Sequence, residues 1–322
     1  MTDTLAAYSL VAVYSAIAVY AIAFVTYVLD LAKRAALAQA VVAQPAAASI
    51  GRASQGATLT AEMPPTTSTG TPGASRYQRT AFALTILAWV IHVAAVVLRA
   101  VAAGRVPWAN LFEFTMTGTA IIVGVFLLVQ LWRDLKLLGA YVTGVVVLLG
   151  SLATANFYVD VTPLPPALQS AWLGIHVLVA MLATGFFAVG GGLSIVQLLQ
   201  QRREAGKAAG IRFLKSFPTS EVLEVTANRV VIVGFALWTF TLMAGAIWAE
   251  RAWGRYWGWD TKEVWTFIIW VVFAGYVHAR ATRGWRGSRS AWLAIIGFAA
   301  VIFNFTVVNL FFSGLHAYTG LK

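Results

Sequence analysis

Four histidines are the side chains of this 322-residue sequence best suited to hold a metal or a cofactor. They are His92, His176, His278 and His316. The sequence contains no cysteine, which excludes a thiol redox relay, a structural disulfide and a thiolate metal site within this chain. Any metal chemistry must therefore depend on imidazoles, on carboxylates or on a bound cofactor.

The segment WGRYWGWDTKEVW, residues 253–265, gathers large aromatic side chains in what should be a connecting loop. Its five aromatic residues are Trp253, Tyr256, Trp257, Trp259 and Trp265. The glycines between them would let a flat apolar ligand, such as a macrocycle, approach the backbone closely. Tryptophan and tyrosine are also enriched at membrane interfaces, where they form an aromatic belt. The residues alone leave both interpretations open.

Two polar patterns predict where helices begin near these aromatic residues. Asp260 and Glu263 fit a D-x-x-E capping box, so we expect a helix to start directly after Asp260. Asn110 and Glu113 form a similar N-x-x-E pattern in the stretch GRVPWANLFEF. We expect the second pattern to serve structure rather than catalysis.

The elements that must position these side chains are membrane-spanning helices. Hydrophobic residues make up 60% of the sequence and charged residues only 11%, whereas soluble domains carry roughly 25% charged residues. Because lipid cannot satisfy open backbone groups, apolar runs of about 20 residues should be helical. We expect eight spans, at about 7–29, 81–103, 112–132, 137–155, 170–198, 229–249, 264–280 and 291–313. The predicted fold is an all-α polytopic membrane helix bundle.

The net charge is +11, and the distribution of the basic residues among the loops indicates the orientation of the chain in the membrane. If the first span runs from outside to inside, most of the 23 lysines and arginines fall in inner loops, as the positive-inside bias requires. Both termini would then face outward. The sequence has no basic and aromatic surface module of the kind that binds nucleic acid, so we expect no nucleic-acid partner.

With this orientation, the histidines fall into two groups. His176 and His316 lie near the outer ends of their helices, at the level of the tryptophan-rich segment. His278 follows Asp260 by about 27 Å of helix, which places it near the inner surface. His92 lies in the middle of its span, with Arg99 on the same helix face. A histidine inside a membrane is costly and usually has a partner or a function.

The chain divides into three predicted parts. Residues 1–34 form an N-terminal transmembrane helix, and residues 35–80, rich in Ala, Thr, Ser, Gly and Pro, form a disordered cytoplasmic linker. Residues 81–322 form the working membrane domain, with an outer tryptophan-rich segment at 250–265. Within it, residues 201–228 predict a short amphipathic helix on the inner membrane surface. The absence of a clear internal repeat argues against a secondary transporter.

The string WGRYWGWDTKEVW closely resembles the tryptophan-rich signature of the haem-handling proteins of cytochrome c biogenesis, the superfamily of CcsA/ResC, CcmC and CcmF. Eight spans in 322 residues resemble CcsA/ResC of System II, called CcsB in actinobacteria. The resemblance covers about residues 81–320. One departure is Thr261, where the family usually has a proline that pre-sets the helix start.

The resemblance implies which residues would handle haem b. His176 and His316 would ligate the iron of an outer haem, against a platform of Trp253, Trp257, Trp259, Asp260 and Trp265. His278 would ligate haem entering from the inner side. His92 is a further candidate for that inner site, although a buried structural histidine explains it equally simply. Asp260 and Glu263 would either order the loop or take part in propionate contacts through Lys262 or Arg255, and the sequence leaves both roles open.

The resemblance also implies partners and a location. We expect a plasma-membrane protein that presents haem at the outer face to the CxxCH motif of apocytochrome c, together with a ResB-type membrane subunit. Proteins that keep the cytochrome thiols reduced would act indirectly. A haem exporter or chaperone that forms no covalent bond would use the same residues. A channel for an unrelated solute would bind no haem.

Overall fold

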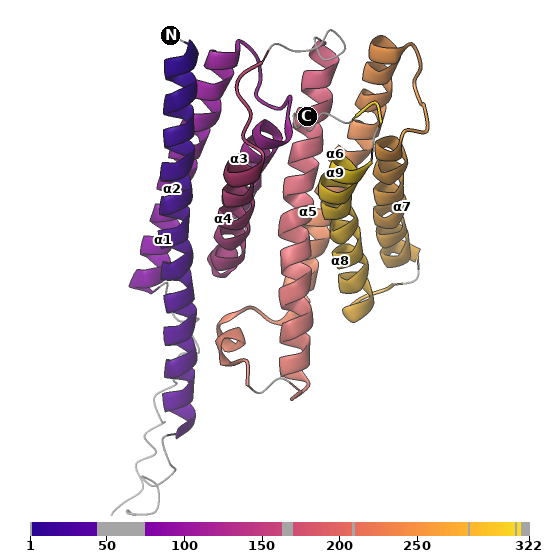
Figure 1. The fold of residues 1–322 in the computed structure, drawn as a ribbon. Coiled ribbons are helices and arrows are strands. Elements are labelled where there is room, and N and C mark those ends of the chain that lie inside the picture. Colours follow the sequence, from indigo (N-terminus) through magenta and orange to yellow (C-terminus); the bar gives the residue numbers. More distant parts are fainter. Residues whose placement is uncertain are drawn as a thin grey trace, which may run out of the picture.

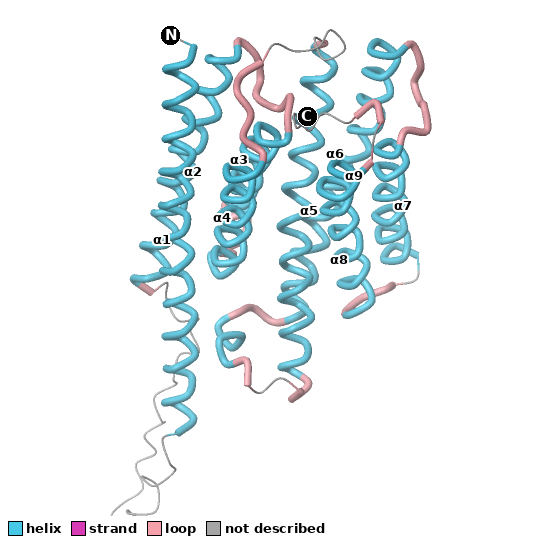
Figure 2. Tube along the Cα trace, in the orientation of Figure 1, coloured by secondary structure: helices cyan, strands magenta, loops and turns pink. Residues whose placement is uncertain are grey.

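The computed structural model describes residues 2–43, 75–162, 170–207, 210–282, 284–312 and 314–316. Every regular element in these ranges is a helix (Figures 1 and 2). Eight helical segments are long and apolar enough to cross a membrane, which confirms the predicted multi-pass bundle. The long elements are α1 (Thr2–Ala43), α2 (Arg76–Ala103), α3 (Leu111–Val129), α4 (Gly139–Asn156), α5 (Ala171–Glu204), α6 (Ser220–Trp253), α7 (Thr261–Thr282) and α8 (Ser288–Phe303).

Short elements complete the described chain. A 3-10 turn, η2 (Lys136–Leu138), precedes α4, and a second, η4 (Arg212–Ser216), lies between α5 and α6. The last span continues from α8 through a π-helical turn, η5 (Asn304–Val308), into α9 (Asn309–Phe311). Such π-turns occur often at functional sites.

The helices extend beyond the predicted spans at two places. The expected linker is shorter than 35–80, because α1 continues to Ala43 and α2 begins at Arg76; residues 44–74 lie outside the described ranges. The alanine-rich sequence after residue 34 favours helix, and the Ser75 side chain caps α2 by accepting a hydrogen bond from the Gln78 amide. The expected surface helix at 201–228 is instead the end of α5, the η4 turn and the start of α6.

The hairpin of α1 and α2 forms one edge of the bundle (Figure 1). Ala81, Ala88 and Ala95 repeat every seven residues along α2 and are fully buried. Ala16 and Ala23 repeat in the same way along α1 and are also buried. Small residues at this spacing let two helix backbones approach closely, which is a common way of packing helices in membranes. Because α1 also packs against α4, the N-terminal helix is an integral part of the bundle.

Helix α5 lies in the middle of the bundle and packs against α3, α6 and α8 (Figure 1). Helix α7 packs on α8 and α6 at the far edge from α1. We call the end of the bundle where α6 passes into α7 the tryptophan end, since residues 253–259 lie there. The starts of α3 and α5 lie at the same end (Figure 1).

Candidate functional site

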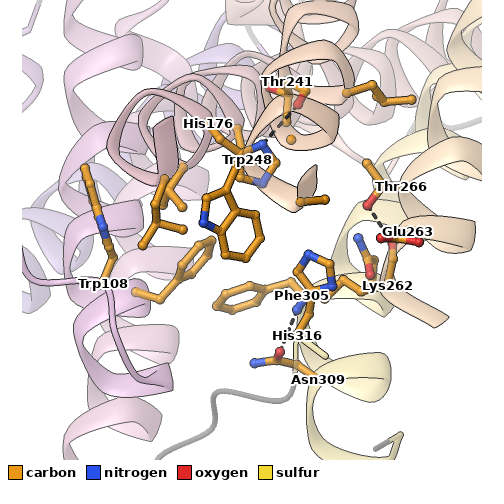
Figure 3. A pocket seen from close by; sticks show the side chains of 18 of the residues that line it. Trp108, His176, Thr241, Trp248, Lys262, Glu263, Thr266, Phe305, Asn309 and His316 are labelled. Atoms are coloured by element: carbon orange, nitrogen blue, oxygen red, sulfur yellow. Dashed lines mark hydrogen bonds between the residues drawn. The ribbon is translucent and has the colours of Figure 1, made fainter. Parts of the chain in front are cut away.

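A large cavity opens at the tryptophan end among α3, α5, α6, α7 and the segment after α8 (Figure 3). Its volume is about 1350 Å³ with its open mouth included. Most of its lining is aromatic or aliphatic, as in pockets that bind apolar small molecules. The polar side chains that line it are His176, Thr184, Thr241, Lys262, Glu263, Thr266, Asn304, Asn309 and His316, with Asn110 and Tyr256 near the loops.

His176 enters the cavity from the second turn of α5. Its Nδ1 donates a hydrogen bond to the backbone carbonyl of Thr241 on α6, at 3.0 Å. A proton on Nδ1 leaves the lone pair on Nε2, which is the form of imidazole that binds a metal. Gly245 makes room for the ring: a Cβ on it would lie 2.8 Å from the His176 Cε1 atom. The helix, the carbonyl and the glycine together fix this imidazole.

His316 reaches the same cavity from the segment that follows α9. Its Nδ1 donates to the Oδ2 atom of Asp260 at 2.8 Å, and the Leu315 amide donates to Oδ1 of the same carboxylate at 3.0 Å. Here too the lone pair is left on Nε2. Gly314 permits this contact, because a Cβ at that position would clash with Oδ1 of Asp260. The structure therefore brings together His176 and His316, which are far apart in the sequence.

Asp260 joins the tryptophan-rich loop to the segment of His316. It caps α7 by accepting a hydrogen bond from the Lys262 amide at 3.3 Å, and its own amide donates to Glu263 at 3.1 Å. The predicted capping box is confirmed, and Glu263 also accepts from the Gly258 amide at 2.8 Å. The hydrogen bond from the His316 imidazole lowers the pKa of the Asp260 carboxyl below its ordinary value, outweighing the opposite effect of burial.

Trp248 on α6 is a cavity residue that the sequence did not single out. Its buried indole stacks on the His176 ring at 5.9 Å with an interplanar angle of 15°, and meets the His316 ring at 5.4 Å and 66°. It thus contacts both imidazoles (Figure 3). Its position inside an apolar span concealed it, although Thr241, Gly245 and Trp248 share one helix face at i, i+4 and i+7.

The tryptophans of residues 253–265 are divided between the cavity and its surroundings. Trp257 lines the cavity, and Trp253 contacts the His316 ring edge-on at 4.9 Å. Trp259 is 77% exposed and has a left-handed backbone, with φ of 57°. Trp265 packs on Phe303 at 4.4 Å and is absent from the cavity lining. The structure therefore does not bring all four tryptophans to one flat platform.

The other two histidines lie apart from this cavity and from each other. His278 is exposed on α7, near the end of that helix away from the tryptophans. His92 is 5% exposed on α2, and its ring meets Tyr20 of α1 edge-on at 5.9 Å. It lines a small separate cavity of about 290 Å³, to which His278 does not contribute. The described residues thus do not pair His92 with His278 around a common ligand.

The N-x-x-E pattern before α3 is confirmed as a cap, and it also organises buried charge. The Asn110 side chain accepts from the Glu113 amide at 2.9 Å. The fully buried Glu113 carboxylate pairs with Arg99 at 3.0 Å and Arg105 at 2.7 Å. These arginines bond the carbonyls of Val159 and of Thr162, which fastens the loop after α4 to the tryptophan end. This supports a structural role for the pattern.

The polar groups of the main cavity suit a cofactor that already contains a metal ion. Among the residues that the structure describes, no three His, Asp or Glu side chains are grouped so that they could hold a bare ion. Two imidazoles with free Nε2 lone pairs in an aromatic cavity suit the axial ligation of a flat metal macrocycle. The partly buried Lys262 ammonium donates to Oδ1 of the neutral Asn309 amide at 2.5 Å and could pair with an acidic group on such a ligand.

Comparison with known proteins shows the family of this chain. Residues 77–316 match the model of the family described as cytochrome C assembly protein. The chain is 36% identical over 255 residues to a protein of Guillardia theta named cytochrome c biogenesis protein CcsA, covering 74% of this chain and 85% of that protein. It is 35% identical over 249 residues to the protein of the same name from Prochlorococcus marinus, covering 69% and 78%. The match begins in α2 and ends at His316, so it includes both cavity histidines.

Proposed function

The chain belongs to the cytochrome C assembly protein family and acts in cytochrome c biogenesis, and from that premise we propose that its cavity holds haem for covalent attachment to apocytochrome c. One observation carries the proposal. His176 and His316 line one cavity, and each donates a hydrogen bond through Nδ1 and so presents Nε2 as a ligand. A flat iron macrocycle accepts one such ligand on each face.

The surrounding side chains fit haem in character. Trp248 and Trp257 offer aromatic surface to an apolar ring, and Lys262 offers a cation to a propionate. We expect Trp257 and Trp253, on either side of the loop tip, to shield the ring from water. Trp259 and Trp265 lie outside the cavity lining, so we expect neither of them to contact haem.

The proposed reaction is the addition of two cysteine thiols of a CxxCH motif to the two vinyl groups of haem. Each addition forms one carbon–sulfur bond and places the thiol hydrogen on the other vinyl carbon, so the step requires no external oxidant or reductant. The part of this chain is to hold the ring still beside the incoming thiols. Positioning of this kind can contribute several kcal/mol to lowering a barrier.

The proposal includes a route and partners. The His278 side chain is exposed on the surface of α7, within an apolar part of the bundle surface. A histidine exposed to lipid is costly, so we expect another molecule to cover it. We propose that a ResB-type subunit covers it and shares an inner haem with it. His92 takes no part in that site, because it lies on α2 at the other edge of the bundle. The tryptophan end would face outward at the plasma membrane, where apocytochrome c docks.

The absorption spectrum of the purified protein tests the proposal. We expect a Soret band when the chain is produced with its membrane partner, and a weaker band in the double variant His176→Ala, His316→Ala. Wild-type protein without any Soret band would overturn haem binding. An assay for thioether-bound haem on co-produced apocytochrome c separates attachment from simple export: holocytochrome supports attachment, and haem release without it supports a chaperone.

A further inference from the structure

We propose that the two cavity histidines have unequal roles: His176 is the permanent ligand, and His316 is the exchangeable ligand, held in place by the Asp260 carboxylate. This inference rests on the proposed function, since it assigns an order of events to haem in that cavity. It makes Asp260 a positioning residue that acts through His316. Three differences between the two histidines support it.

The first difference is in the backbone that holds each ring. His176 belongs to the regular helix α5, and the Gly245 surface of α6 confines its imidazole. His316 lies after the end of α9, in a short turn at residues 314–316 that belongs to no helix. A helical residue moves only with its helix, whereas a residue in a short irregular segment can swing by changing a few backbone angles.

The second difference is in the number of attachments. Two hydrogen bonds tie residues 314–316 to the rest of the described chain, from the Leu315 amide and from the His316 ring, and both end on Asp260. Asp260 is itself held at the start of α7 by its capping bonds and is largely buried, with 7% of its side chain exposed. Apart from the edge-on ring contacts with Trp248 and Trp253, one carboxylate therefore holds His316 in the cavity.

The third difference is electronic. The His176 ring donates to a neutral peptide carbonyl, whereas the His316 ring donates to a carboxylate. A carboxylate partner makes an imidazole a more basic ligand and fixes its orientation. While that hydrogen bond lasts, His316 is the stronger donor to iron. When it breaks, the ring loses both its orientation and its added basicity, so its bond to iron weakens and becomes easier to exchange.

These differences suit the last stage of thioether formation. The histidine of the CxxCH motif follows directly after the second cysteine, so covalent attachment brings its imidazole next to the iron. In the proposed exchange, the bond from iron to Nε2 of His316 breaks and a bond from iron to the peptide imidazole forms. No proton or electron is transferred. His176 then remains as the last bond between the product and this protein.

Single glycine variants of the two histidines test the inequality. We expect His316→Gly to retain haem with a five-coordinate, high-spin spectrum, and added imidazole to restore the six-coordinate spectrum. We expect His176→Gly to lose most of its haem during purification and to respond poorly to imidazole, because helices enclose that position. Both proteins should be compared at equal amounts of folded protein, judged by gel filtration.

The variant Asp260→Asn tests the positioning role without removing the helix cap, since asparagine caps a helix as well as aspartate does. We expect the reduction potential of bound haem to rise, and haem affinity to fall about 10–100-fold, as for other outer partners of ligating histidines. Asp160→Asn is the matched control, because Asp160 is an exposed carboxylate at the same end and does not line the cavity.

The outcomes separate this inference from the function on which it rests. Wild-type protein that binds no haem would overturn the proposed function. Wild-type protein with a bis-histidine spectrum would keep that function. The inference alone would then fail if both glycine variants lost haem equally, or if Asp260→Asn kept the potential and affinity of the Asp160→Asn control.

Discussion

At the scale of single residues, the cavity depends on small side chains as much as on its histidines. Gly245 and Gly314 both stand where a Cβ would displace a functional group: the His176 ring in the first case and the Asp260 carboxylate in the second. Neither glycine has a motif around it that marks it as important. Because they lack a Cβ, these glycines leave space in which the His176 ring can bind the Thr241 carbonyl and the His316 ring can bind Asp260.

The variant Gly245→Ala tests this dependence. The new methyl group would lie 2.8 Å from Cε1 and 2.9 Å from Nδ1 of His176, so we expect it to push the ring away from the Thr241 carbonyl. Haem content, measured by the Soret band of purified protein, should fall strongly while helix content by circular dichroism stays the same. Gly118→Ala on α3 is the control, because a Cβ there meets no atom within 4 Å. Equal haem content in the two variants would contradict the assignment.

Lys262 lines the cavity as a partly buried cation whose hydrogen-bond partner among the described residues is the neutral Asn309 amide. If it pairs with a haem propionate, Lys262→Met should weaken haem binding by about 1.5–3 kcal/mol, the usual range for a hydrogen bond to a charged group. Titration with haem dimethyl ester, which lacks the propionate charges, provides the comparison. The substitution should matter little for the ester, and an equal loss for both ligands would refute the pairing.

At the scale of elements, the spans, their caps and the shared outer position of His176 and His316 could be predicted from the sequence, whereas the shape of the cavity could not. The spans follow from the length and apolarity of sequence runs, and the caps follow from the types of a few neighbouring residues, such as Asn110 and Asp260. Both properties are local in the sequence. The meeting of His176 with His316, and the role of Trp248 between them, depend on how α5, α6 and the last span pack together. Trp248 shares one face of α6 with Thr241 and Gly245, but this spacing gains its meaning only from the packing of that face against His176.

The contact of α1 with α2 carries a prediction of its own. Ala88→Leu would place three extra carbon atoms at a fully buried position between the two helices. Overpacking of this kind costs about 1–3 kcal/mol, so the detergent-solubilised protein should melt at a lower temperature. Leu87→Ala, at a position 50% exposed on the same helix, is the control and should change melting little. If Ala88→Leu melted like the control, the close packing of this pair would be wrong.

At the scale of the whole molecule, orientation in the membrane remains a prediction from charge. Because the natural sequence contains no cysteine, single cysteines can report it directly. We expect a membrane-impermeant maleimide to label Arg255→Cys, in the tryptophan-rich loop, on intact cells. Arg133→Cys, between α3 and η2, should be labelled only after the cells are permeabilised. The reverse pattern would place the cavity on the inner side and remove its access to an external cytochrome.

The seam between α1 and α2 also has a consequence for how the bundle finds its correct register. If α1 slid along α2 by one heptad, about 10.5 Å, alanines that recur every seven residues would again face one another. Small residues alone would therefore allow several alignments of similar packing energy. Polar contacts between the two helices remove this ambiguity: Arg34 of α1 donates to Gln78 of α2, and the most buried group among these contacts is Asp30. It is bound by Arg34 and by Ser75 in the observed alignment, and a slipped hairpin would leave its buried carboxylate without Ser75. The polar contacts around Asp30 thus select one alignment of the two helices from several that van der Waals packing would accept.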